Sequence, residues 1–83
     1  IPKLPEYTTE EGIKQIRNNF KNIADWKNIE DLIPEGFTFN KKLKKSGLAG
    51  IFSASLELTK EGVVNIMQKK LFEKILIRKN IIK

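Results

Sequence analysis

The chain has 83 residues, of which 40% are hydrophobic and 31% are charged, and its net charge is +6. This length suits one small domain, the apolar content is too high for a disordered chain, and no long uncharged apolar run is present to span a membrane. Cysteine and histidine are both absent, so the sequence has no disulfide, no thiolate metal site and no imidazole base. The positive charge favours an acidic partner, either nucleic acid or an acidic protein surface, although the abundance of Ile, Lys and Asn is also typical of an AT-rich genome.

The first seven residues predict an extended linker. Pro2 and Pro5 disfavour helix at the residues before them, and the chain starts with Ile1 rather than Met. We therefore expect residues 1–7 to be a linker from the upstream region of a longer parent chain. Residues 8–83 are expected to form the domain.

A capping box predicts the first helix. Thr8 can accept a hydrogen bond from the backbone of Glu11, whose side chain can reach back to Thr8. Apolar residues then recur at spacings of three, four and three, which places them on one helical face. The pattern predicts a helix from about Thr9 to Asn22, with its apolar face made by Ile13, Ile16, Phe20 and Ile23.

A turn and a short helix follow. Asn28 is a suitable N-cap for a helix through Ile29, Leu32 and Ile33, and the Pro34-Glu35-Gly36 sequence ends that helix. Trp26, in the preceding turn, is interpreted as an anchor of the hydrophobic core in preference to an exposed ligand contact.

The segment from Phe37 to Ser46 is polar and rich in lysine, so we expect a loop there. A helix is predicted from about Gly47 to Lys60, ending at Gly62 in the left-handed conformation. At 100° per residue, its apolar residues fall within roughly 160° of arc. The face expected to be buried holds Leu48, Ile51, Phe52, Ser55, Leu56, Leu58 and Thr59, and the face expected to lie opposite holds Gly50, Ser53, Glu57, Lys60 and Glu61.

Two alternating, β-branched segments end the chain. Val63 to Gln68 and Leu71 to Lys79 predict two strands, and Lys69-Lys70 predicts the turn between them. The predicted fold class is therefore α+β, a small winged-helix domain in which three helices precede a two-stranded β-hairpin wing.

The sequence offers little support for an enzyme. Glu57 and Glu61 are four residues apart on the outer face of a helix, where solvated carboxylates are the usual interpretation. No glycine-rich loop stands between a strand and a helix, so there is no nucleotide-binding fingerprint. We expect a protein without catalytic activity and without a cofactor.

Winged helices most often bind DNA, and this is the main alternative. The helix that would enter the major groove presents Gly50, Ser53, Ala54, Glu57 and Glu61. The two glutamates repel phosphates, and the small residues read few base edges. Non-specific phosphate contacts remain open through the wing lysines Lys69, Lys70 and Lys74. The outer face of this helix is therefore predicted to pack on another protein, and a DNA-binding winged helix of a transcription regulator or nucleoid protein is the alternative.

The segment LAGIFSASLELTKEGVVNIMQKKLFEKILIR resembles the C-terminal domain of the ScpA family, the bacterial kleisins (segregation and condensation protein A). The matching positions are Phe52, Ala54, Leu56, Glu57, Leu58, Gly62, Gln68, Phe72 and Ile75. Upstream, Tyr7-Thr8, Asp25-Trp26 and Leu32-Ile33-Pro34 are similar to the proteobacterial branch of the family. The sequence departs from the family pattern at Glu73-Lys74, where Gly or Pro is frequent, and in its lysine-rich segment before the long helix.

The resemblance implies a partner. The C-terminal winged helix of a kleisin docks on the ATPase head of an SMC protein and so closes the ring that acts in chromosome condensation and segregation. It implies no ATPase activity, a cytoplasmic and nucleoid-associated location, and no membrane partner. Binding to ScpB belongs to parent-chain regions that this sequence does not contain.

The resemblance also suggests interface residues, namely Phe52, Leu56, Gln68, Phe72 and Ile75. On the helical wheel, however, Phe52 and Leu56 face the expected core, so each can equally be a packing residue. For Phe72 and Ile75, a role in core packing and a role in contacting the partner are about equally expected. Gln68 is a polar residue in an apolar strand, which favours a specific hydrogen bond.

Overall fold

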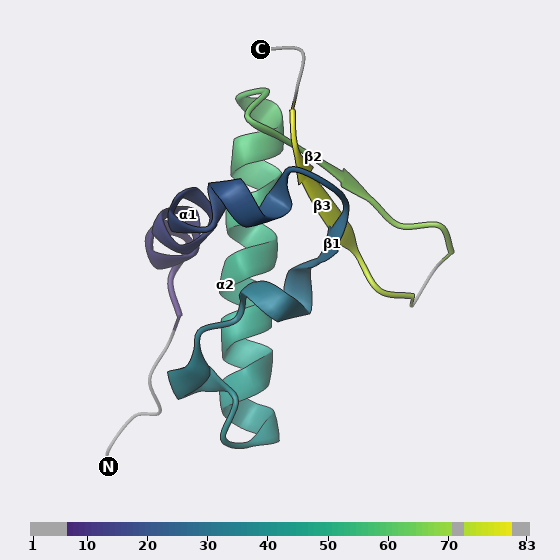
Figure 1. Cartoon of the computed structure of the whole chain (residues 1–83). Coiled ribbons are helices and arrows are strands. Elements are labelled where there is room, and N and C mark those ends of the chain that lie inside the picture. The colour runs from purple at the N-terminus through teal and green to yellow at the C-terminus, as the bar shows by residue number, and fades with distance from the viewer. Residues whose placement is uncertain (1–6, 71–72, 81–83) are drawn as a thin grey trace.

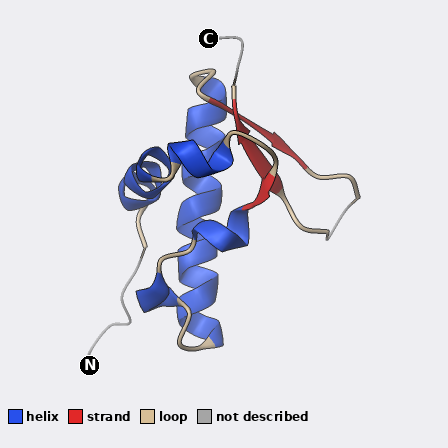
Figure 2. Ribbon diagram, viewed as in Figure 1, coloured by secondary structure: helices blue, strands red, loops and turns tan. Residues whose placement is uncertain are grey.

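The computed structural model describes residues 7–70 and 73–80 and has an α+β fold (Figures 1 and 2). The two α-helices are α1 (Thr9–Asn18) and α2 (Lys41–Lys60), and the three strands are β1 (Lys27–Asn28), β2 (Val64–Met67) and β3 (Leu76–Lys79). Short 3-10 turns cover Phe20–Ile23, Ile29–Leu32 and Glu35–Phe37. Helix α2 runs through the middle of the molecule, with α1 crossing it on one side and the sheet on the other (Figure 1).

The beginning of the domain follows the predicted local signals. The capping box is present: the Glu11 amide donates to Thr8 Oγ1 at 3.1 Å, and the Thr8 amide donates to Glu11 Oε1 at 3.4 Å. Helix α1 ends at Asn18, and the remainder of the predicted helix continues as the 3-10 turn Phe20–Ile23. Tyr7, the last residue of the predicted linker, contacts the domain: its amide donates to Ser46 Oγ at 3.1 Å, and its ring centroid lies 4.9 Å from that of Phe37.

The sheet has one more strand than the sequence predicts. The predicted short helix, one of the three, is replaced by the 3-10 turn Ile29–Leu32, although its predicted cap is present: Asn28 Oδ1 accepts from the Glu30 amide at 3.0 Å. Just before it, β1 pairs antiparallel with β3, so that the strand order is β1-β3-β2. Two residues are too few to show alternation, and this strand exists only because β3 offers it a partner. The predicted two-strand wing is therefore a three-stranded sheet.

Helix α2 begins six residues before its predicted start, so the predicted loop from Phe37 to Ser46 is largely wrong. Asn40 is the N-cap, and its side chain accepts from the Leu43 amide at 2.9 Å. The four lysines that follow are good helix formers. They are not apolar, however, so this segment lacks the apolar periodicity that predicts a helix from sequence. The predicted end is confirmed, since Gly62 has φ 77° and the Val63 amide donates to the Leu58 carbonyl at 2.9 Å.

The wheel prediction for α2 is confirmed only in part, since Ile51, Ser55 and Leu58 are buried as predicted but other positions are not. The buried residues of α2 are Gly47, Gly50, Ile51, Ala54, Ser55 and Leu58. Gly50 and Ala54, assigned to the outer face, lie against α1, whereas Phe52 and Leu56, assigned to the core, are 36% and 40% exposed. The glycine–alanine face is buried because α1 crosses it closely at Gly12, where an ideal Cβ would lie only 2.5 Å from the Gly50 carbonyl oxygen.

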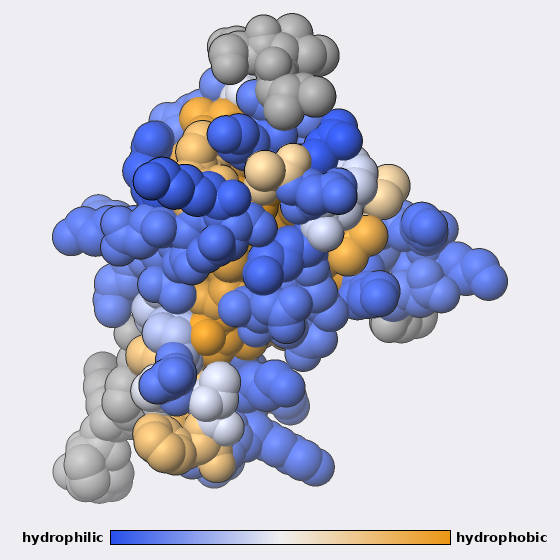
Figure 3. Space-filling view, in the orientation of Figure 1, coloured by the Kyte–Doolittle hydropathy of each residue, from blue (hydrophilic) through white to orange (hydrophobic). Residues whose placement is uncertain are grey.

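The core lies where α2 meets α1, the 3-10 turns and one face of the sheet. Its buried apolar residues are Ile16, Ile23, Ile29, Leu32, Ile33, Ile51, Ala54, Leu58, Val64 and Ile77. Trp26 is not among them, so its predicted role as a core anchor is wrong; it is partly exposed, with the Arg78 guanidinium 4.6 Å from its ring centroid. The face seen in Figure 3 is mostly hydrophilic, with hydrophobic atoms showing in a seam down its middle.

Candidate protein-binding groove

Helix α2 carries apolar side chains that the fold does not bury. Leu48, Phe52 and Leu56 follow each other at intervals of four residues, so they form a stripe along one side of the helix. Leu48 is partly buried, but Phe52 and Leu56 are more than a third exposed. Among the described residues the other large exposed hydrophobic side chain is Phe39, which is 83% exposed and lies just before α2.

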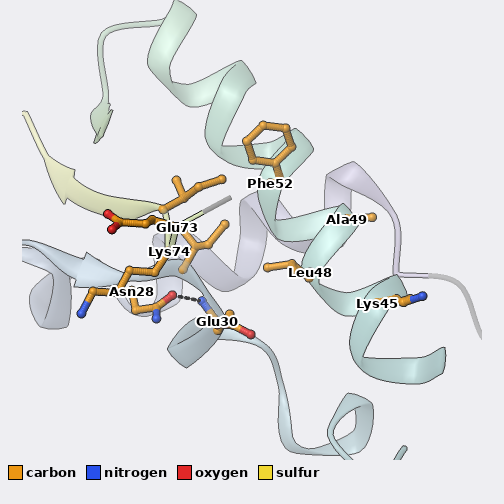
Figure 4. A pocket seen from close by; sticks show the side chains of 10 residues that line it. Asn28, Glu30, Lys45, Leu48, Ala49, Phe52, Glu73 and Lys74 are labelled. Atoms are coloured by element: carbon orange, nitrogen blue, oxygen red, sulfur yellow. Dashed lines mark hydrogen bonds between the residues drawn. The ribbon is translucent and has the colours of Figure 1, made fainter. Parts of the chain in front are cut away.

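A cavity of about 520 Å³ opens beside this stripe, between α2, the start of the 3-10 turn after β1, and the approach to β3 (Figure 4). Ile29, Leu48, Phe52 and Ile75 supply its apolar wall. The polar lining residues are Asn28, Glu30, Lys45, Glu73 and Lys74.

A smaller cavity of about 190 Å³ adjoins the first, since both are lined by Phe52 and Ile75. Its other lining residues are Ile66, Met67 and Gln68 from β2 and the residue after it. We call the two cavities together the α2–hairpin groove. The groove joins the exposed side of α2 to both arms of the hairpin.

The structure brings three of the five predicted interface residues to this groove. Phe52 and Ile75 line both cavities, and Gln68 lines the smaller one. Leu56 lies one turn beyond Phe52 and lines a separate cavity on the side of α2 toward Thr9. Phe72 lies outside the described residues.

Gln68 makes the hydrogen bond that its polarity predicts. It is exposed just after β2, and its Nε2 donates to the Glu73 carbonyl at 2.7 Å. This bond joins the two arms of the hairpin near its tip. Gln68 therefore shapes the end of the groove whether or not it also touches a partner.

Leu48 and Ile66 also line the groove, although neither is among the predicted interface residues. Leu48 stands four residues before Phe52, a spacing that would have placed it on the same stripe. Ile66 belongs to a strand with alternating residues, and the sequence alone does not show which residues of that strand line the groove and which pack on the core.

The free edge of β2 lies beside the groove. The Asn80 amide donates to the Val63 carbonyl at 3.0 Å, and hydrogen-bonded pairs alternate with non-hydrogen-bonded pairs in an antiparallel ladder. Val64 and Ile66 therefore direct their backbone N–H and C=O groups away from β3. Since β2 is the last strand in the order β1-β3-β2, these groups can pair with a strand from another chain.

Lysines surround the groove without filling it. Lys69, Lys70 and Lys74, the predicted DNA-contacting residues, are all exposed around the tip of the hairpin, and Lys74 also lines the larger cavity. Lys44 is 3.8 Å from Glu30 in an exposed ion pair, a type that contributes little to stability. Glu57 places a negative charge on the exposed surface of α2, so no continuous basic face runs along the helix.

The described part of the chain shows little acid–base chemistry. It holds no group of three acidic, histidine or cysteine residues that could bind a metal. Burial of the Tyr7 side chain, and then the nearby Glu11 charge, raises the pKa of the Tyr7 phenol above its usual value of 10.0. Tyr7 does not line the groove. Its raised pKa therefore reflects its burial where the N-terminal segment meets α2.

Comparison with known proteins does not assign the chain to a family. No protein-family model and no curated protein matches the chain. Within residues 7–70 and 73–80, no helix has the length and apolar character needed to cross a membrane.

Proposed function

We propose that the chain is the C-terminal winged-helix domain of a ScpA-like kleisin, and that it docks on the ATPase head of an SMC protein to close the ring used in chromosome condensation and segregation. The observation that carries this proposal is the exposure of Phe52 and Leu56 on α2. Both are positions of the kleisin-like sequence pattern, and a core role does not account for either of them.

The fold supports the proposal in its order of elements. A long helix leads through a glycine stop into an antiparallel hairpin, and a short strand from the first half of the domain adds to that hairpin. This order of elements supports the proposed winged-helix assignment. In a DNA-reading winged helix, the helix before the wing carries side chains that reach base edges; here that position carries Phe52 and Leu56, which suit a protein surface.

The energetics of the groove also favour a protein partner. Burying the remainder of an exposed phenylalanine or leucine contributes on the order of 1 kcal/mol, at about 25 cal/mol per Å² of apolar surface. Phe52 lies in the concave site between helix and hairpin, and an aromatic anchor in such a site is typical of the few residues that dominate binding. The free edge of β2 offers backbone groups for a further strand.

The decisive measurement is binding of the purified domain to the SMC head from the same genome, by calorimetry at moderate salt. We expect a one-to-one complex that Phe52→Ala weakens at least tenfold, or about 1.4 kcal/mol. Phe39→Ala is the matched control, because it removes an equally large and more exposed ring outside the groove. It is expected to leave the affinity within about twofold. Absence of a complex with both proteins folded would refute the proposal.

The second candidate is a DNA-binding winged helix, favoured by the exposed lysines at the hairpin tip. It predicts that duplex DNA binds the domain alone, with an affinity that falls steeply between low and moderate salt. Replacing Lys69, Lys70 and Lys74 with glutamine would then abolish binding, while Phe52→Ala would leave it unchanged. The two variants thus separate the two functions on the same protein.

A further inference from the structure

The face of the sheet that points away from α2 forms a second surface. Val64 and Ile77 turn inward and are fully buried, so their neighbours along each strand turn outward. The register aligns these outward residues in two rows across the strands. One row is Arg78 and Asn65, with Trp26, the residue before β1, lying against Arg78. The other row is Asn28, Leu76 and Met67. We call these six partly buried residues the outer sheet face.

Arg78 is held at the middle of this face without a polar partner. Its guanidinium is 4.6 Å from the centroid of the Trp26 ring, which fixes its position. Its Nε is buried and has no hydrogen-bond acceptor, and none of the ion pairs between described residues includes Arg78. A buried N–H without an acceptor destabilises a fold, so Arg78 is poorly explained by stability alone.

The composition of the outer sheet face selects its partner. It contains no acidic residue, and it combines Trp, Met and Arg, which are enriched in the centres of protein interfaces. A second copy of the same face would bring two Arg78 side chains together without a counter-charge. A nucleic-acid base would compete with the guanidinium that already lies over the Trp26 ring.

We propose that the outer sheet face binds an acidic and partly apolar segment of another protein. A carboxylate of that segment accepts hydrogen bonds from the terminal N–H groups of Arg78, and its apolar side chains pack on Trp26 and Leu76. Trp26, Leu76 and Arg78, which make the proposed contacts, do not line the α2–hairpin groove, whereas Asn28 and Met67 border both surfaces. The inference therefore does not rest on SMC binding.

Trp26 reports binding directly, because it is the sole tryptophan of the chain. The probe is a synthetic peptide of alternating glutamate and leucine, titrated into the whole domain while Trp26 fluorescence is recorded. We expect a saturable change in fluorescence with the glutamate peptide. A peptide of alternating lysine and leucine is expected to give no such change.

The variants test whether Arg78 makes the contact. Arg78→Lys keeps the charge but loses the planar fork and should weaken binding about tenfold, and Arg78→Leu should abolish it. Arg17→Leu is the matched control: it removes one positive charge from an exposed arginine near Glu61 and should leave the affinity within about twofold. Circular dichroism establishes that each variant is folded. The proposal is overturned if the wild-type domain gives no saturable change, if the lysine peptide binds equally well, or if Arg17→Leu weakens binding as much as Arg78→Lys.

Discussion

Substitution of Gly12 by alanine tests the closest helix contact in the domain. An ideal Cβ on Gly12 would lie 2.5 Å from the carbonyl oxygen of Gly50 and 2.8 Å from Cβ of Ala54. Carbon atoms in van der Waals contact are about 3.5–4.0 Å apart, so α1 would have to move away from α2 by roughly 1 Å. Neither neighbour can give way, since one is backbone and the other is a Cβ.

Two opposing terms set the size of the effect. Alanine in place of glycine favours a helix by about 1 kcal/mol. Overpacking of a rigid contact costs about 1–3 kcal/mol, and the upper part of that range applies where no flexible side chain can move. We therefore expect Gly12→Ala to lower the free energy of unfolding by about 1–2 kcal/mol, which for a domain of this size lowers the Tm by at least about 4 °C.

Urea unfolding followed by circular dichroism measures this difference. Gly36→Ala is the matched control, because no atom lies within 4 Å of the position of its Cβ and its φ is not positive. That variant should be unchanged or more stable by up to about 1 kcal/mol. If Gly12→Ala proves as stable as the wild type, α1 and α2 are not held together by this close approach. The close approach of α1 then does not explain why Gly50 and Ala54 are buried.

Three further predictions concern the ends of the helices and the N-terminal segment. Asn40→Ala removes the acceptor for the Leu43 amide and should lower the free energy of unfolding by about 1 kcal/mol in the same urea assay. Lys41→Glu should raise it by about 0.3–1 kcal/mol, because the first turn of α2 holds no acidic residue, and the gain should shrink in high salt. Tyr7 is the sole tyrosine, so absorbance near 295 nm follows its ionisation, whose midpoint should lie above 10 in the folded domain and return to about 10 in urea. Because the folded pKa is the higher one, the native state holds this proton more tightly, and stability should fall as the pH rises above 10.

Local signals predicted the helix starts and stops that a few adjacent residues determine. The Thr8–Glu11 capping box, the Asn28 cap and the left-handed Gly62 are each present. The groups that form each cap lie within a few residues of one another in the sequence, so each cap can be predicted without knowledge of tertiary contacts. The Asn40 cap is of the same kind, but lysines rather than apolar residues follow it, so no apolar periodicity indicates a helix there.

Features that depend on distant partners could not be predicted in this way. Strand β1 exists through pairing with β3, about fifty residues later in the chain. The position of Trp26 outside the core depends on the same pairing, which places it opposite Arg78. The α2–hairpin groove likewise combines residues from both halves of the domain, so only those on the Phe52 stripe of α2 were accessible to a helical-wheel argument.

The error in the wheel of α2 bears directly on function. The predicted buried face of α2 included Phe52 and Leu56, and the predicted outer face included Gly50 and Ala54. In the structure, α1 packs against Gly50 and Ala54, and a helix whose small residues are buried has no room in that interface for Phe52 or Leu56. A sequence under selection for stability alone would gain by making those two positions polar, since an exposed phenylalanine or leucine contributes little to folding and favours association. The presence of Phe52 and Leu56 on the exposed side of α2 is therefore better explained by the proposed protein partner than by the fold. Substitution of Phe52 tests that explanation without disturbing the contact between α1 and α2.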